Sequence, residues 1–362
     1  MSTMREIGWE ACLLESRPDP ALVRLARQRL GYVPGAVGYY AAVPWTVSAQ
    51  IDLIEASYVT VTIDRQLADL ITLVVSQDNS CRYCFAAQRV LLRMMGVPGS
   101  RIDAIERGHA TADLGERERR ALEFARRVSR SNPLPTPADR RALDRVGLSD
   151  LAAKEIAAYA ALYVYFNRAS TLPALPPQGM EAYETSWSLR FLGPLFARRF
   201  RRRRRRIAVT PTSSATPAGP FAELVAGLDG LPAAAALRDA LDAAWRSEIL
   251  PARTKGLVFA VIARGLGCPA SERESIRLLD AAGMSRDEID AVLAHLAAPT
   301  LSPVERAAAP FARETIRYQP AQIQQRAQAV RDALTREEFI ELITVAALAN
   351  AVCRLGVVLD GS

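Results

Sequence analysis

Two cysteines three residues apart are the residues of this sequence best suited to chemistry. Cys81 and Cys84 lie in the stretch SQDNSCRYCFAAQ, residues 76–88. Asn79 and Ser80 favour the end of one helix and the start of another, so both thiols are predicted in a first turn, on one face. Free N–H groups and the positive end of the helix dipole stabilise a thiolate there. This spacing lets one sulfur attack and the other close a disulfide.

Two other interpretations of the pair stay open. A zinc site needs three or four protein ligands. The sequence offers only His109, His295 and cysteines far from the pair, with no second Cys-x-x-Cys, so we expect no metal. Two buried structural cysteines are the stronger alternative, because a free cysteine packs as a small hydrophobic residue. Cys12 and Cys353 are expected to be core residues of that kind.

The segment that holds the pair belongs to an internal duplication. RMMGVPGSRIDAIERGH, residues 93–109, matches DAAGMSRDEIDAVLAHL, residues 280–296, at a shift of 187 positions. GLSDLAAKEIAAYAALYVYFNR, residues 147–168, matches ALTREEFIELITVAALANAVCR, residues 333–354, at a shift of 186. Several matches in nearly one register identify two repeats.

Each repeat is predicted to be a chain of helices. Apolar residues recur at spacings of three and four in RQLADLITLVVS, RRALEFARRV and KEIAAYAALYVYF, and strand alternation bounded by hairpin turns is absent. The fold class is therefore all-α. The aromatic residues crowded on one helix of the first repeat are expected in the core; they are Tyr159, Tyr163, Tyr165 and Phe166.

The repeats are separated by the segment FLGPLFARRFRRRRRRIAVTPTSSATPAGP. We expect a first domain at residues 1–190, a linker at 191–217, rich in Arg and then in Pro, Thr and Ser, and a second domain at 218–362. Arg198, Arg199 and the run from Arg201 to Arg206 supply eight positive charges, which exceed the net charge of +7. A solvated linker is the favoured interpretation, and binding of nucleic acid or an anionic surface is a minor alternative because aromatic residues for base stacking are lacking.

The cellular location is predicted from what the sequence lacks. The N-terminus has no apolar stretch after a basic start, so a secretory signal is not expected. No apolar run reaches the roughly 20 residues of a membrane span. We therefore expect a cytoplasmic protein, in which thiols stay reduced unless they are catalytic or redox-sensing.

The stretch DLITLVVSQDNSCRYCFAAQRVLLRMMG resembles the carboxymuconolactone decarboxylase superfamily, in particular its alkyl hydroperoxidase D-like branch. The family pattern is an acidic residue, eleven positions, Cys-x-x-Cys, three positions and a His, closed by a Gly. Asp69 stands where Glu is usual, Gln88 stands at the His position, and Gly96 fits the closing Gly. Tandem members with a basic linker and a degenerate second half have a similar layout. The resemblance also implies, as the alternative to a core role, that the aromatic helix with Tyr159 to Phe166, and Trp45, line a pocket beside the thiols.

The resemblance implies a thiol-dependent hydroperoxidase with no cofactor. Cys84 would attack the peroxide and Cys81 would resolve it, with Asp69 as a shortened relay acid. Gln88 can orient water or a thiolate, but an amide cannot shuttle protons, so the relay is expected to be weakened. The alternative is a non-redox member that binds or converts a small organic metabolite. Expected partners are a peroxide or small organic substrate, a thiol or disulfide protein as reductant, and a second copy of the chain.

The second repeat is expected to serve structure rather than chemistry. At the shift of 187, Gly256 takes the place of Asp69 and Cys268 that of Cys81. Ser271 replaces Cys84, and Ser275 stands at the position of Gln88. A single cysteine cannot form the internal disulfide. We therefore expect the second repeat to pack against the first as a partner subunit would, giving a pseudo-dimer.

Overall fold

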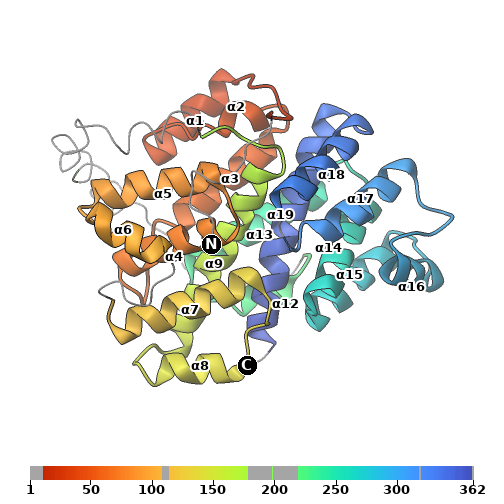
Figure 1. Ribbon diagram of the computed structural model, residues 1–362. Coiled ribbons are helices and arrows are strands. Elements are labelled where there is room, and N and C mark those ends of the chain that lie inside the picture. The colour runs from red at the N-terminus through yellow and green to blue at the C-terminus, as the bar shows by residue number, and fades with distance from the viewer. Residues whose placement is uncertain (1–10, 108–113, 178–197, 199–218, 318, 361–362) are drawn as a thin grey trace.

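The duplicated sequence folds into two helical repeats, seen side by side in Figure 1. The computed structural model describes residues 11–107, 114–177, 198, 219–317 and 319–360. These residues contain helices and no β-strand, which confirms the all-α prediction. His109 and the linker predicted at 191–217, apart from Arg198, lie outside them, so the domain boundaries stay a prediction.

The helices of the first repeat are α1 (Pro20–Leu30), α2 (Val37–Tyr40), α3 (Pro44–Ala56), α4 (Arg65–Asp78), α5 (Arg82–Met94), α6 (Gly99–Glu106), α7 (Glu116–Arg130), α8 (Pro137–Asp144) and α9 (Asp150–Thr171). Those of the second are α12 (Ala222–Ala226), α13 (Pro232–Arg246), α14 (Ala252–Leu266), α15 (Pro269–Ala281), α16 (Arg286–His295), α17 (Pro303–Glu314), α18 (Pro320–Asp332) and α19 (Arg336–Leu359). Helices α3 to α9 have their counterparts in α13 to α19, in the same order.

Local sequence signals set the ends of these helices. Asp64 begins α4 by accepting a hydrogen bond from the backbone N–H of Leu67 at 2.8 Å, as aspartate commonly does at a helix start. Thr335 and Glu338 form a reciprocal capping box at the start of α19. Gly31 ends α1 in the left-handed conformation, with φ of 85°, which glycine adopts without strain.

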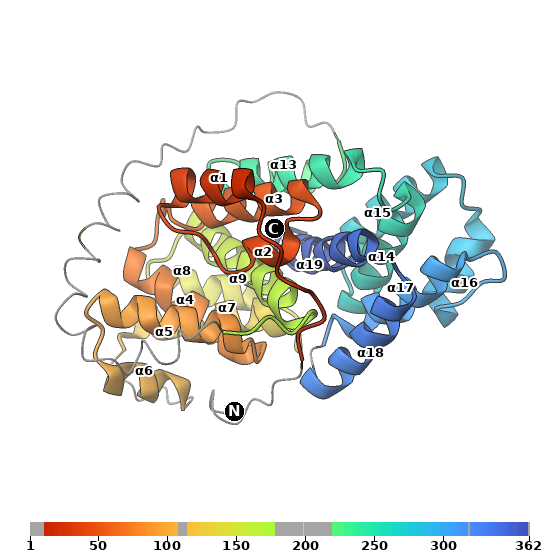
Figure 2. The same cartoon turned by 90° about the horizontal axis from the view of Figure 1, so that it is seen from above.

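The repeats meet along their equivalent long helices. Figure 2 shows α9 and α19 next to each other in the middle of the molecule, and α13 lying against α3 of the first repeat. Most of α9 and α19 is buried. Because each contact joins a helix to its own counterpart, the second repeat occupies the place of a partner subunit. The arrangement is the pseudo-dimer that the duplication predicts.

Helix α19 corrects the expectation that no segment is long and apolar enough to span a membrane. Its 24 residues meet that test by length and composition. However, 89% of its most apolar window is buried inside the protein. The apolar residues of α19 face other helices, chiefly α9 and α14, as those of a central core helix do.

Trp45 lies at the boundary between the repeats and not at a pocket beside the thiols. Its indole Nε1 donates to Glu341 Oε2 on α19 at 3.1 Å. Glu341 also forms a buried ion pair with Lys255, with 3.1 Å between Oε1 and Nζ. The pocket-lining alternative for Trp45 is therefore wrong, because a tryptophan N–H that leaves water needs a hydrogen-bond acceptor and finds one across the interface.

Two equivalent arginines connect the repeats reciprocally. Arg168 on α9 donates from Nε to the backbone oxygen of Thr315, just after α17, at 2.7 Å. Arg354, 186 positions later on α19, donates from Nε to the backbone oxygen of Ser129 on α7 at 2.9 Å. Both side chains are about 1% exposed. Carbonyl groups at helix C-termini lack intrahelical partners and carry partial negative charge, so they suit a buried cation.

We predict that Arg354→Ala lowers the free energy of unfolding by about 2–5 kcal/mol, because it leaves buried carbonyls at the interface without donors. Urea denaturation followed by circular dichroism measures the change. The exposed Arg286→Ala serves as the control and is expected to stay within about 0.5 kcal/mol of the parent. A loss below about 1 kcal/mol for Arg354→Ala would show that the reciprocal arginines do not stabilise the interface.

Candidate functional site

The turn between α4 and α5 places the two thiols. Asn79 caps the end of α4, and Ser80 reverses the chain in a left-handed conformation with φ of 48°. Cys81 is then the N-cap of α5, where its Sγ accepts a hydrogen bond from the backbone N–H of Cys84 at 3.3 Å. The prediction that Cys81 lies inside the first turn is wrong by one position. Because Ser80 absorbs the reversal, Cys81 remains extended and caps the helix with sulfur.

The two sulfurs differ in ionisation. Burial raises the pKa of the Cys84 thiol, but hydrogen bonds from the side chains of Cys81, Ser170 and Asn167 outweigh it, and the pKa is lowered. Burial raises the pKa of the Cys81 thiol well above its ordinary value, and its hydrogen bond to Cys84 adds to the increase. Both cysteines are free thiols. Cys84 is therefore the sulfur that ionises first.

A pocket of about 650 Å³ opens on Cys84. Its walls come from α5 and α9, from residues 30–36 after α1, and from the end of α3. Most of the lining is apolar, and Gln88, Tyr163 and Ser170 are among its polar residues. Cys81 is not among the lining residues. A ligand in this pocket would therefore meet Cys84 first, with Cys81 behind it.

Two of the four crowded aromatic residues of α9 line this pocket. Tyr163 and Phe166 form part of its wall, with their rings edge to face at a centroid distance of 5.5 Å. Tyr165 is fully buried away from it, as the core interpretation predicts. The core interpretation holds for Tyr165, and the pocket alternative holds for Tyr163 and Phe166. Helix α9 contacts both the pocket and the second repeat, and the sequence of a continuously apolar helix does not show which of its faces lines a cavity.

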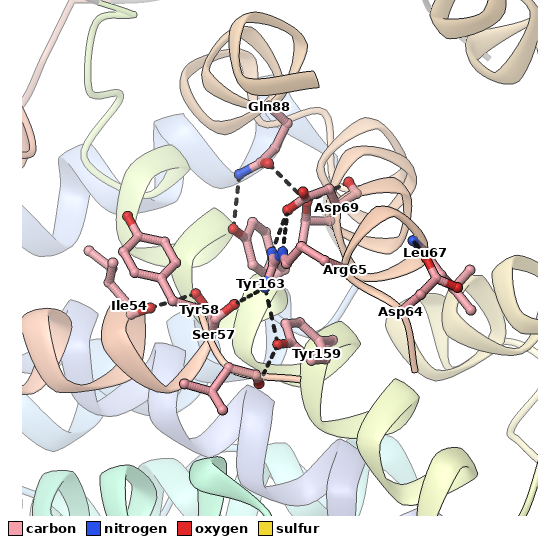
Figure 3. A network of polar contacts seen from close by, with 12 residues as sticks. Ile54, Ser57, Tyr58, Asp64, Arg65, Leu67, Asp69, Gln88, Tyr159 and Tyr163 are labelled. Atoms are coloured by element: carbon pink, nitrogen blue, oxygen red, sulfur yellow. Dashed lines mark hydrogen bonds and ion pairs between the residues drawn. The ribbon is translucent and has the colours of Figure 1, made fainter. Parts of the chain in front are cut away.

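Gln88 lies on the pocket wall with the sulfur, one turn beyond Cys84 on α5. Its Nε2 donates to the hydroxyl oxygen of Tyr163 at 2.9 Å, and its Oε1 accepts from Thr72 Oγ1 at 2.9 Å. Figure 3 shows the side-chain amide of Gln88 next to the phenol of Tyr163. Gln88 therefore fixes the position of a phenol at the pocket.

Asp69 forms an ion pair with Arg65 next to the hydrogen bonds of Gln88. Arg65, one turn earlier on α4, approaches Asp69 Oδ1 with Nη2 and with Nε, the latter at 3.0 Å (Figure 3). The same guanidinium donates to the backbone oxygen of Ser57 at 2.7 Å and lies over the ring of Tyr159. Burial opposes the charge of Arg65, but Asp69 outweighs it and the pKa of Arg65 is raised. Asp69 is buried and does not line the pocket.

The structure thus brings three of the four predicted site residues together. Cys81, Cys84 and Gln88 lie at one end of α5, and Cys84 and Gln88 line the pocket, whereas Asp69 reaches them only through neighbouring groups. Thr72 provides that link, since its hydroxyl lies 2.7 Å from the backbone oxygen of Asp69 and 2.9 Å from Gln88 Oε1. The catalytic role of all four residues remains a prediction.

Sequence reasoning missed two residues of α9 that contact Cys84. The Cys84 thiol lies 3.6 Å from Ser170 Oγ, and Asn167 also hydrogen-bonds to it. The repeat alignment contains a signal for both. At the shift of 186, the positions of Ser170 and Asn167 hold Gly356 and Cys353 in the repeat that lacks the second thiol. The second repeat, which lacks a thiol at the position of Cys84, thus also lacks the two polar side chains that contact Cys84 in the first repeat.

The second repeat fills the equivalent space with its own side chains. Cys268 stands at the N-cap position of α15, as Cys81 does in α5, but its Sγ accepts no capping hydrogen bond from the backbone and lies 3.2 Å from Ser271 Oγ. A Cβ atom at Gly356 would lie only 2.6 Å from Cys268 Sγ and 2.9 Å from Ser271 Oγ. Gly356 therefore permits close packing where the first repeat has a serine. Among the described residues, no group of three or more His, Cys, Asp or Glu side chains could hold a metal.

The fold and the site define a duplicated all-helical protein with one dithiol on a pocket. The sequence profile of the Carboxymuconolactone decarboxylase family matches residues 50–127 and 232–314, one match in each repeat. The chain is therefore a two-repeat, carboxymuconolactone decarboxylase-like protein. No curated protein matches the chain significantly.

Two solved structures match part of the chain. One is an alkylhydroperoxidase AhpD core, an uncharacterised peroxidase-related protein from Ralstonia eutropha JMP134, with 22% identity, a TM-score of 0.42, and coverage of 47% of this chain and 92% of that chain. The other is an uncharacterised peroxidase-related protein from Silicibacter sp. TM1040, with 23% identity, a TM-score of 0.41, and coverage of 49% and 95%.

We predict that Ser170→Gly, the residue found at the equivalent position of the second repeat, raises the pKa of Cys84. Removing a hydrogen bond from a charged sulfur is expected to slow its alkylation at pH 7 by about three- to tenfold and to move the pH midpoint upward. Iodoacetamide labelling of Cys84, followed by mass spectrometry in a Cys12→Ser background, measures both. Thr171→Val is the control, because that hydroxyl bonds only to the backbone oxygen of Asn167 among the contacts described. An unchanged midpoint for Ser170→Gly would contradict the assignment.

Proposed function

We propose that the protein is a thiol-dependent oxidoreductase of the hydroperoxidase type that uses the Cys81–Cys84 dithiol. The observation that carries the proposal is the pocket opening on Cys84, the thiol with the lowered pKa, while Cys81 lies hydrogen-bonded behind it. A nucleophilic thiol must be ionised and reachable, and a resolving thiol must be adjacent. The match of both repeats to the model of the Carboxymuconolactone decarboxylase family is consistent with this chemistry.

The reaction proceeds in three steps, and the last step uses an external reductant. The Cys84 thiolate attacks the terminal oxygen of a hydroperoxide, the O–O bond breaks, and the departing alkoxide takes up a proton to leave as an alcohol. Cys84 is then a sulfenic acid. The Cys81 thiol attacks its sulfur, a disulfide forms and water leaves. A dithiol reductant, reaching the disulfide through the pocket at Cys84, restores both thiols and is itself oxidised.

The groups around the pocket support nucleophilic attack better than proton delivery. Cys81, Ser170 and Asn167 hydrogen-bond the sulfur, so the thiolate does not depend on a base within the site. The leaving oxygen, in contrast, meets the amide of Gln88 and the phenol of Tyr163. An amide does not exchange protons at neutral pH, and a phenol, with an ordinary pKa of about 10, is a weak acid. We therefore expect slow turnover.

Thiol titration before and after peroxide tests the proposal directly. We expect an organic hydroperoxide to remove two titratable thiols per chain, because oxidation of Cys84 is followed by closure of the disulfide. Cys84→Ser is expected to abolish the loss, and Cys268→Ser, the control in the degenerate repeat, to preserve it. Retention of all thiols in the parent at millimolar peroxide would refute the redox function.

Restoring a titratable group at position 88 tests the weakened relay. Gln88→His is expected to speed peroxide consumption by about tenfold or more, because imidazole titrates near neutral pH and can protonate the leaving oxygen. Stopped-flow or coupled peroxide assays measure the rate. The exposed Gln28→His controls for an added histidine elsewhere. A flat rate with Cys84 still essential would show that proton transfer does not limit turnover.

A non-redox pocket is the second candidate function. It is favoured by the mostly apolar lining and by the fixed Gln88–Tyr163 pair, which can hydrogen-bond one polar group of a small organic molecule. The ion pair that holds Asp69 away from the pocket fits this function equally well. Unchanged thiols in the titration, together with saturable binding of small apolar acids or alcohols that Tyr163→Ala weakens, would establish it.

A further inference from the structure

A buried aspartate in the first repeat is held by two arginines. Asp78 ends α4 with its side chain fully buried. Its Oδ1 lies 2.5 Å from Arg130 Nη2 and 3.7 Å from Arg126 Nη1, both on α7. Arg126 also donates to the side-chain oxygen of Gln77 at 3.2 Å. The two cations therefore have a carboxylate and an amide as acceptors.

The second repeat keeps the arginines and lacks both acceptors. At the shift of 187 positions, Arg126 and Arg130 correspond to Arg313 and Arg317, whereas Asp78 corresponds to Gly265. The position of Gln77 holds Arg264, whose guanidinium is paired with Glu272 at 2.6 Å. Within the part of the chain that the structure describes, neither Arg313 nor Arg317 has an ion-pair partner.

These unpaired arginines line a pocket of about 320 Å³. Gly265 forms part of its wall, with Arg313 at the end of α17 and Arg317 just beyond that helix. Glu314 also lines the pocket, but its Oε1 accepts both Nε and Nη2 of Arg326, at 3.0 and 2.9 Å. The carboxylate on the wall is therefore already engaged with a different arginine.

We propose that this pocket binds a small oxyanion, a carboxylate or phosphate group, in the place that Asp78 fills in the first repeat. Two guanidinium groups that line one pocket can recognise such groups by charge-assisted hydrogen bonds. The first repeat supplies the anion from its own chain, and the second receives it from a ligand. The site is separate from the dithiol pocket and does not depend on the thiol chemistry.

Gly265 provides a variant that supplies the missing carboxylate. A side chain at this position would meet the ends of the Arg313 and Ile316 side chains, both of which can move. Gly265→Asp is therefore expected to reproduce the aspartate with its two arginines and to occupy the anion site from within. Arg313→Gln removes one of the two cations while keeping a polar side chain of similar reach.

Isothermal titration calorimetry on the full chain, with inorganic phosphate and separately with acetate at constant ionic strength set by sodium chloride, tests the proposal. The parent is expected to bind at least one of these anions saturably with one site. Arg313→Gln and Gly265→Asp are each expected to weaken that binding about tenfold or more, and the exposed Arg286→Gln to leave it unchanged. The arginines of residues 198–206 are the same in every variant, so their contribution cancels.

The two anions distinguish the possible ligands. Tighter phosphate binding identifies a phosphorylated ligand, and tighter acetate binding identifies a carboxylate. Absence of saturable binding of both anions to the parent would overturn the proposal. Binding that survives unchanged in both Arg313→Gln and Gly265→Asp would also overturn it, because the anion would then lie elsewhere. Circular dichroism of each variant confirms that it is folded.

Discussion

The buried guanidinium of Arg168 joins the dithiol turn to the second repeat, and the rest of the arrangement depends on it. A buried charge is tolerated only when hydrogen bonds replace its lost hydration. Arg168 finds them in Asn79 Oδ1 at 2.8 Å, in the turn before Cys81, and in the backbone oxygens of Thr315 and Ile316 beyond α17. Asn79 in turn donates to Ser129 Oγ, and the backbone oxygen of Ser129 accepts from Arg354. The turn that makes Cys81 an N-cap is thus stabilised from both sides of the interface.

This connection gives the second repeat a role in the site although it lacks the second thiol. The repeats keep the same helix order and the same interface arginines, but they differ where side chains face the thiols. Ser271 stands at the position of Cys84, and Gly356 at that of Ser170. Residues at the interface must supply hydrogen bonds to the buried arginines. The residues of the second repeat that correspond to the Cys84 site need only pack without leaving a cavity. The two interface arginines are therefore kept, while the residues that surround Cys84 are not.

Much of the fold could be predicted because its signals are local. Helical periodicity and the matching segments of the duplication each lie within short stretches of sequence, and both predictions are confirmed. The position of Cys81 was missed by one residue because it depends on the left-handed backbone of Ser80. The contacts of Cys84 with Ser170, 86 positions away, and of Trp45 with Glu341, 296 positions away, arise only when helices pack. Spacing within one segment cannot show them.

The geometry around Cys84 also constrains what kind of oxidant would suit the site. A lowered pKa supplies thiolate but also makes the sulfur a weaker nucleophile, since nucleophilicity falls with basicity. With Gln88 in place of a titratable residue, and Asp69 paired with Arg65, no strong acid faces the leaving oxygen. The rate would then depend steeply on how stable the leaving group is without a proton. Under the proposed chemistry, oxidants that release a weakly basic alkoxide, carboxylate or thiolate are favoured over hydrogen peroxide, which releases the strongly basic hydroxide. The apolar pocket acts in the same direction, because it holds an organic group beside the sulfur and gives little binding energy to a molecule as small and polar as hydrogen peroxide.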